Sequence, residues 1–217
     1  MAGVNWRGTL VPIRVFNSNC DWAGTPIQHV QKARQLGARV TNRSAGYEAA
    51  TRGYELPECA EIRTQFQQLG ALFVAAVADT QRQTLRWPAR CAFAFSVGAS
   101  TRANQGAEFN TTENHVMVVA PGVDVSTTGG GANDEYKHIG NSAGATGTSF
   151  AAPQAAGVLQ VMIAMGIPHD VAFMALWHSA TPVPLCDRTA PRTRCKGRIN
   201  MERALGSSPD TGIFELW

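Results

Sequence analysis

A serine between a polar loop and an apolar segment is the strongest candidate for chemistry in this sequence. Ser149 lies in Gly-Thr-Ser-Phe-Ala-Ala-Pro, residues 147–153, where a Gly-rich stretch meets an apolar helical pattern. At a helix N-terminus, unpaired N–H groups and the helix dipole favour negative charge, which suits a nucleophile whose intermediate carries an oxyanion. Gly147 allows substrate to approach, and Pro153 is expected in the first turn, where its missing N–H does no harm. The alternative interpretation is an ordinary helix cap followed by proline.

The segment 147–153 resembles the Gly-Thr-Ser-x-Ala-x-Pro signature around the nucleophile of subtilisin-like serine proteases. Other segments resemble further motifs of that family and occur in its order: residues 42–46, 75–79, 87–89, 96–99, 119–123 and 197–205. The resemblance extends to about Leu205. On these motifs the chain is identified as the C-terminal portion of a subtilase catalytic domain.

The resemblance implies roles for five residues. Ser149 corresponds to the nucleophile, and its own N–H corresponds to one oxyanion donor. Ser44, Ala45 and Gly46 correspond to a backbone segment that binds an extended peptide as an added strand. Without the resemblance, these three residues would be interpreted as an ordinary turn. Asp79 corresponds to the oxyanion-hole position, which the family usually fills with Asn.

Asp79 is a departure that bears on the chemistry. An ionised Asp offers only acceptors and would repel an oxyanion, whereas Asn offers an N–H donor. Some convertases of the family carry Asp there, and an Asp79 protonated through burial could donate. A second departure, Gln154 after Pro153 where the family has His, is expected to be neutral.

The family's catalytic Asp and His are the most serious departure, because its pattern places both upstream of residue 1. The predicted strand 10–16 corresponds to the strand that follows the His helix. The chain's own histidines are interpreted as surface or core residues: His29, His115, His138, His169 and His178. A serine without its base is a poor nucleophile, so residues 1–217 alone are expected to be inactive or nearly so.

Two functions remain open. The first is a serine endopeptidase that hydrolyses peptide bonds through an acyl-enzyme on Ser149, with its N-terminal segment missing. The second is a non-catalytic subtilisin-like module that binds peptides or proteins. The expected partners are a peptide or protein substrate and, for the first function, the missing N-terminal segment of the same domain.

Periodicity predicts the elements that position these residues. Apolar runs predict strands at 10–16, 38–42, 71–77, 92–99 and 116–120. Helical spacing predicts helices at 26–36, 57–69, 149–166 and 169–179. Thr25, Pro26 and Gln28 form a capping-box pattern, and Gly37 ends that helix. Residues 127–147 and 182–196 are expected to be loops. The order predicts an α/β fold with a mostly parallel sheet sandwiched by helices and its N-terminal part missing. Residues 1–205 are expected to form a partial peptidase domain and 206–217 a tail.

Composition limits the other possibilities. The chain has 217 residues, 16% of them charged, and a net charge of +3, which is too small to indicate nucleic acid or a membrane surface. No apolar run reaches the roughly 18 residues of a membrane span. The chain shows no signal-peptide pattern, although the family resemblance implies an extracellular destination. No cofactor or metal is predicted: calcium is common in the family, but no dense acidic cluster is present.

The five cysteines leave the redox compartment open. Cys186 and Cys195 flank a polar loop and could close a small disulfide, whereas Cys59 and Cys91 lie in apolar patterns and are expected to be small buried hydrophobic residues.

Overall fold

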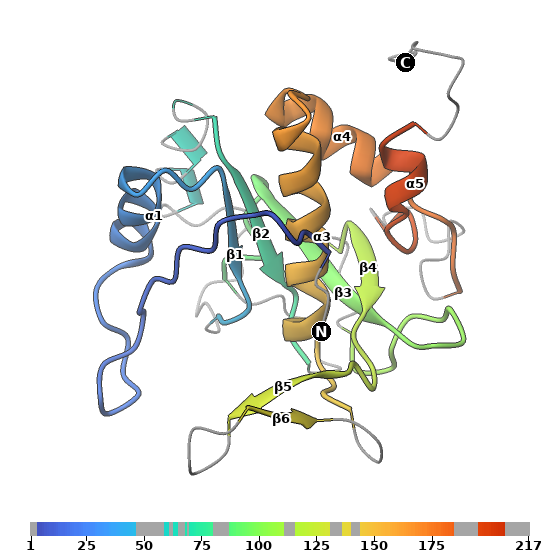
Figure 1. Ribbon diagram of the computed structural model, residues 1–217, viewed down its shortest axis with the longest axis horizontal. Helices are drawn as coiled ribbons and strands as arrows, with labels where there is room; N and C mark the ends of the chain where they lie inside the picture. The colour runs from blue at the N-terminus through green and yellow to red at the C-terminus, as the bar shows by residue number, and fades with distance from the viewer. Residues whose placement is uncertain are drawn as a thin grey trace.

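A four-stranded parallel sheet forms the centre of the molecule (Figure 1). The computed structural model describes residues 4–46, 59–60, 63–64, 68, 70–79, 87–110, 116–130, 136–139, 144–184 and 195–206. The strands occur in the spatial order β1 (Val40–Arg43), β2 (Leu72–Ala76), β3 (Ala94–Ser100) and β4 (Val118–Pro121). The named helices are α1 (Pro26–Gln35), α3 (Thr148–Ala164), α4 (His169–His178) and α5 (Met201–Ala204). The predicted α/β fold with a parallel sheet is confirmed.

Side chains cover both faces of this sheet, which explains the unbroken apolar run of β2. Leu72 and Val74 pack in one apolar cluster together with residues of α3 and α4. Phe73 and Ala75 pack in a second cluster together with Val30 of α1. Successive residues of a strand point to opposite faces, so a sheet covered on both sides requires apolar residues at every position.

Local sequence signals fix the ends of α1 as predicted. Thr25 Oγ1 accepts a hydrogen bond of 3.3 Å from Gln28 N–H, and Gln28 Oε1 accepts one of 2.8 Å from Thr25 N–H. Gly37, just beyond the C-cap, has a φ of 85°, which glycine adopts without strain. The capping box and the glycine stop are confirmed.

The other predicted helices agree with the structure within a few residues, with one addition. In the predicted helix 57–69, the described residues at 59–60, 63–64 and 68 are helical. The remaining residues of that helix lie outside the described part. After α4, which was predicted as the last helix, the chain forms the short α5, whose N-cap Asn200 accepts a hydrogen bond from Arg203 N–H.

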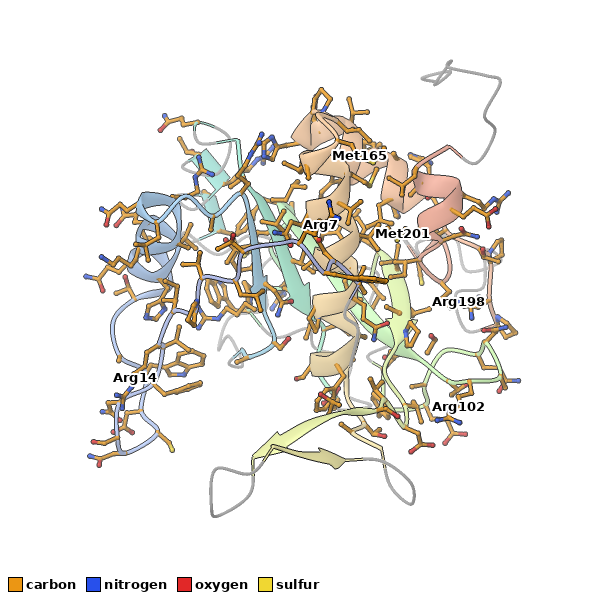
Figure 2. All side chains as sticks on the ribbon, viewed as in Figure 1. Arg7, Arg14, Arg102, Met165, Arg198 and Met201 are labelled. Atoms are coloured by element: carbon orange, nitrogen blue, oxygen red, sulfur yellow. A yellow bond between two sulfur atoms is a disulfide. The ribbon has the colours of Figure 1, made fainter. Side chains whose placement is uncertain are left out.

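The predicted strand at 10–16 is wrong. Phe16 forms only an isolated bridge with Trp22, and no strand of the described residues pairs with the segment. Its apolar alternation is real, but a strand also requires a neighbour for its backbone hydrogen bonds. The preceding residues run along α3, where a Cβ added at Gly157 would lie 2.8 Å from Val4; Figure 2 shows Arg7 over this helix.

The predicted loop 127–147 is also partly wrong, because it contains an antiparallel hairpin. Strand β5 (Thr127–Gly130) pairs with β6 (Tyr136–Ile139), in the register Thr127 to Ile139. The Gly-, Ser- and Asn-rich composition suggested irregular structure, but pairing between two nearby segments decides strand formation.

The cysteines differ from expectation in their bonding. Cys59 and Cys91 are buried as predicted, but they form a disulfide with a Cα–Cα distance of 5.4 Å. Cys195 is also disulfide-bonded, and its predicted partner Cys186 lies outside the described residues. Cys20 is free and exposed.

Two further expectations concern the limits of the chain and membranes. Most of the predicted tail 206–217 lies outside the described residues, so the division at residue 205 stays a prediction. In the described part, no helix has the length and apolarity needed to cross a bilayer.

Candidate active site

The predicted site residues meet at the carboxyl ends of β1 and β2, where α3 begins (Figure 1). Residues 44–46 follow β1, Asp79 follows β2 after a short turn, and Ser149 is the second residue of α3. The carboxyl edge of a parallel sheet is the usual position for ligand sites in α/β folds. The fold therefore brings three distant segments to one place.

Gly147 is the N-cap of α3 and has room for no side chain. Its N–H donates to Gly122 O at 2.8 Å, which ties the start of the helix to the end of β4. A Cβ at position 147 would lie 2.7 Å from Asp79 Oδ2, and the φ of 151° also disfavours other residues. Glycine at this position therefore lets the carboxylate approach the helix N-terminus.

Asp79 binds the first turn of α3. Its Oδ1 accepts a hydrogen bond of 2.6 Å from Thr148 N–H. The preceding Ala78 has a φ of 111°, a strained value for a residue with a side chain, and its N–H donates to Thr148 Oγ1 at 3.3 Å. Asp79 is exposed, so the burial that the sequence analysis considered for it is not observed. The carboxylate offers Thr148 an acceptor where an Asn would also offer an N–H.

Ser149 is hydrogen-bonded to the predicted peptide-binding segment. Its Oγ donates to Ser44 O at 3.0 Å, and Ser44 Oγ donates to Ser149 O at 2.9 Å. Asn42 Nδ2 in turn donates to Ser44 Oγ at 3.1 Å. Both serines are half-buried. The N–H of Ser149 belongs to the first turn, where no intrahelical partner is available.

Arg43 contacts the segment 44–46 through a hydrogen bond to Ala45. This residue was not identified from the sequence. Its guanidinium carbon lies 4.4 Å from the Trp22 ring centre and 4.8 Å from that of Trp87, and its Nε donates to Ala45 O at 3.2 Å. Only 9% of Arg43 is exposed. The sequence signal that could have identified Arg43 was its position inside the motif 42–46. Its contacts with Trp22 and Trp87 could not be predicted, because both tryptophans are distant in sequence.

Pro153 and Gln154 follow Ser149 within α3, and the position of Pro153 differs from expectation. Pro153 lies inside α3, beyond its first turn, so its missing N–H does matter to the helix. Gln154 Nε2 donates to Pro121 O at 2.6 Å and to Phe150 O at 2.9 Å. Gln154 therefore holds the start of α3 against the end of β4.

The described histidines take part in other contacts. His29 Nε2 lies 2.5 Å from Ala23 O, and the His178 ring lies 4.8 Å from that of Trp177. His115 and the side chain of His138 are outside the described part. Within the described ranges, no histidine forms a hydrogen bond with Ser149, and no three metal-ligating side chains come together.

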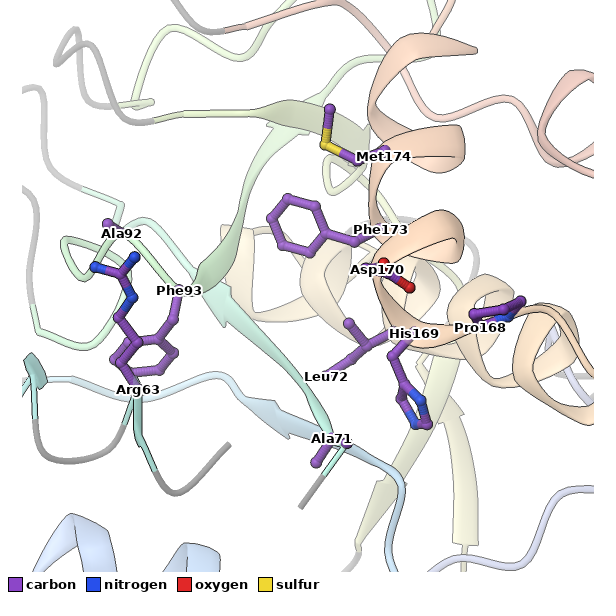
Figure 3. Close-up of a pocket in the computed structure, with 11 residues that line it drawn as sticks. Arg63, Ala71, Leu72, Ala92, Phe93, Pro168, His169, Asp170, Phe173 and Met174 are labelled. Atoms are coloured by element: carbon purple, nitrogen blue, oxygen red, sulfur yellow. The ribbon is translucent and has the colours of Figure 1, made fainter. Parts of the chain in front are cut away.

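His169 lines a separate pocket of about 620 Å³ at the opposite end of the sheet (Figure 3). The pocket lies where β2 and β3 begin and α4 starts, and its walls include Ala71, Leu72, Phe93, His169, Phe173 and Met174. Burial, followed by the charges of Arg39 and Arg34, holds the pKa of His169 below its usual 6.5, and Asp170 opposes this effect. Because Asp79 follows the carboxyl end of β2, this pocket is not part of the Ser149 site.

Comparison with known proteins identifies the family. The chain matches the Subtilase family over residues 1–184. It is 34% identical over 222 residues to the Extracellular basic protease of Dichelobacter nodosus, covering 95% of this chain and 34% of that protein. It is 36% identical over 156 residues to Subtilisin Savinase of Lederbergia lenta, covering 71% and 53%.

A solved structure agrees with this assignment. The prenylagaramide maturation protease PagA superposes with a TM-score of 0.64 at 27% identity, covering 82% of this chain and 65% of that one. The chain belongs to the subtilase family of serine proteases. It spans about a third of the length of the first curated relative and about half of the second.

Proposed function

We propose that this chain supplies the nucleophile and a peptide-binding edge of a serine endopeptidase. The observation that carries the proposal is Ser149 at the N-terminus of α3, with its Oγ 3.0 Å from Ser44 O. In the reaction, Ser149 Oγ bonds to the carbonyl carbon of a peptide and loses its proton to a base. The C–N bond then breaks, the leaving amine takes up a proton, and water hydrolyses the resulting ester.

The substrate proposed for this site is an extended peptide. The backbone of residues 44–46 continues from β1, an edge strand among the described strands, and can pair with an added strand. Ser149 contacts the same segment through Ser44, so a peptide bound there would have a carbonyl near the hydroxyl. By analogy with the extracellular relative, we propose an extracellular site of action.

We further propose that residues 1–217 alone have little or no peptidase activity. Ser149 Oγ donates to a backbone carbonyl, which is too weakly basic to take its proton. Family membership supports a histidine base, but the described histidines have other contacts. The nucleophile therefore requires a base that the described residues do not place beside it.

A fluorophosphonate probe with added imidazole tests both parts of this proposal. Imidazole is a small base with a pKa near neutrality, so it can take the proton of Ser149 in place of a histidine side chain. We expect little labelling of the purified chain alone and clear labelling with imidazole, rising as the pH increases and imidazole loses its proton. Mass spectrometry should place the adduct on Ser149, and Ser149→Ala should abolish it.

The other outcomes discriminate among the alternatives. Rapid peptide hydrolysis without imidazole, lost in Ser149→Ala, would keep the nucleophile and overturn the predicted inactivity. Absence of labelling under every condition would overturn the proposal that Ser149 is a nucleophile.

That last outcome would favour the second candidate, a non-catalytic peptide-binding module. The observation in its favour is Asp79, whose carboxylate gives the oxyanion position an acceptor. For such a module we expect saturable binding of an extended peptide, measured by fluorescence anisotropy, that is unchanged in Ser149→Ala.

A further inference from the structure

Pro153 removes a backbone hydrogen bond directly behind the proposed nucleophile. It lies inside α3, which begins at Thr148. Proline has no N–H for the carbonyl four residues earlier, and within a helix its ring also crowds that carbonyl. The carbonyl in question belongs to Ser149. The backbone of the proposed nucleophile thus lacks the helical bond from residue 153.

The Ser44 side chain donates a hydrogen bond to this same carbonyl. The distance from Ser44 Oγ to Ser149 O is 2.9 Å. Asn42 Nδ2 donates to Ser44 Oγ at 3.1 Å, so the hydroxyl accepts one bond and its own hydrogen points to Ser149. The return bond from Ser149 Oγ to Ser44 O, at 3.0 Å, closes a ring between residues 105 positions apart.

We propose that Ser44 is a positioning residue whose hydroxyl replaces the N–H that Pro153 lacks. The hydrogen bond from this hydroxyl fixes the backbone of Ser149 against the segment 44–46. The position of the nucleophile relative to the peptide-binding edge is therefore constant. This inference deepens the proposed function and rests on Ser149 as its nucleophile. The specific consequence is that Ser44 matters because residue 153 is proline.

A double-mutant cycle tests this dependence. Ser44→Ala removes the hydroxyl, and Pro153→Ala supplies a backbone N–H at position 153. We expect Ser44→Ala to lower the folding equilibrium constant of the full chain about fivefold, the usual effect of one hydrogen bond. In the Pro153→Ala background, the same substitution should lower it less than about twofold. Urea unfolding followed by tryptophan fluorescence measures all four constants.

Two further variants serve as controls. Ser44→Thr keeps the hydroxyl and should restore most of the loss. Ser179→Ala removes a hydroxyl that donates to a helix carbonyl elsewhere, Leu176 O at 3.4 Å, and its effect should be the same with Pro153 and with Ala at that position. An equal effect of Ser44→Ala in both backgrounds would overturn the proposal, as would failure of Ser44→Thr to restore stability.

A thiol at position 149 tests positioning apart from stability. In a Cys20→Ser background, which removes the free exposed cysteine, Ser149→Cys introduces a thiol that reacts with iodoacetamide. We expect Ser44→Ala to raise its alkylation rate about fivefold, because the first turn of α3 is less constrained. Adding Pro153→Ala should reverse this increase. An unchanged rate would show that Ser44 does not position residue 149.

Neither measurement depends on peptidase activity, so the two proposals fail separately. A chain that shows the coupling but is never labelled by fluorophosphonate would keep the role of Ser44 and overturn the proposed function. A chain that is labelled at Ser149 but shows no coupling between Ser44→Ala and Pro153→Ala would overturn only the proposed role of Ser44.

Discussion

At the scale of single residues, the Asp79 carboxylate suits the N-terminus of α3 but not the stabilisation of an oxyanion. Its carboxylate accepts a 2.6 Å hydrogen bond from Thr148 N–H at the start of α3, where the helix dipole favours negative charge. The same carboxylate lacks an N–H for a developing oxyanion. At position 79, helix stability and transition-state stabilisation therefore favour different residues.

The variant Asp79→Asn should separate these two effects. Asn keeps the acceptor for Thr148 N–H and adds a donor, and an oxyanion donor typically contributes about 10²–10³ in rate. We expect the imidazole-dependent labelling rate at Ser149 to rise at least about tenfold, while the free energy of unfolding falls by about 0.5 kcal/mol. Labelling kinetics and urea unfolding measure the two quantities.

Asp79→Ala is the control for that experiment, since it removes the acceptor and adds no donor. Because it adds no donor, its labelling rate should stay well below that of Asp79→Asn. A folded Asp79→Asn variant with an unchanged or slower rate would contradict an oxyanion role for position 79.

At the scale of elements, the disulfide connects the helical residues near position 59 with the turn before β3. Cys59 and Cys91 are 32 residues apart in sequence, and both lie in the apolar cluster that contains Phe73 and Val30. Periodicity placed both residues correctly in the core, but it could not show that they face each other. The bond constrains the unfolded chain, so its effect on stability depends mainly on the length of the closed loop.

Removing this disulfide should destabilise the fold considerably. For the double variant Cys59→Ala/Cys91→Ala, we expect the free energy of unfolding to fall by about 3–4 kcal/mol, as loop-closure entropy predicts. Urea unfolding under non-reducing conditions measures the change. Cys20→Ala, at the exposed free cysteine, should change it by less than about 0.5 kcal/mol. A loss below about 1 kcal/mol in the double variant would contradict the expectation.

At the scale of the whole molecule, the proposed active site and the His169 pocket lie at opposite ends of the sheet. Ser149 and Asp79 lie at the carboxyl end, whereas the pocket with His169 lies at the amino end. Burial and the nearby positive charges of Arg39 and Arg34 lower the pKa of His169. Stability should therefore depend on pH through a residue that is remote from the proposed chemistry.

This dependence has a definite sign. The folded protein binds a proton at His169 less readily than the unfolded chain, whose pKa is about 6.5, so acid favours unfolding. The free energy of unfolding should fall as the pH drops below about 6.5 through the lowered pKa, and His169→Gln should remove that part of the slope. Urea unfolding between pH 5 and pH 8 measures it. A slope in His169→Gln identical to that of the unmodified chain would contradict the assignment.

Local signals in the sequence were sufficient for elements whose ends depend on near neighbours. The capping box at Thr25 and Gln28 needs only three residues of separation, and Gly147 with Ser149 marks the start of α3 in the same way. The unbroken apolar run of β2 reports burial on both faces, which the residue types alone can show. Family resemblance, carried by the order of the motifs, was confirmed over most of the chain.

Tertiary structure alone decided the features that require two distant segments to meet. Residues 10–16 have the pattern of a strand but no strand partner among the described residues, whereas the polar segments of β5 and β6 do pair. Three contacts form only because the fold brings distant segments together: the Cys59–Cys91 disulfide, the contact of Arg43 with Trp22, and the hydrogen bonds between Ser44 and Ser149. Sequence determines which groups can interact, because propensity and burial are local properties. Packing decides which of them do, because a hydrogen bond or a disulfide forms only within a few ångströms.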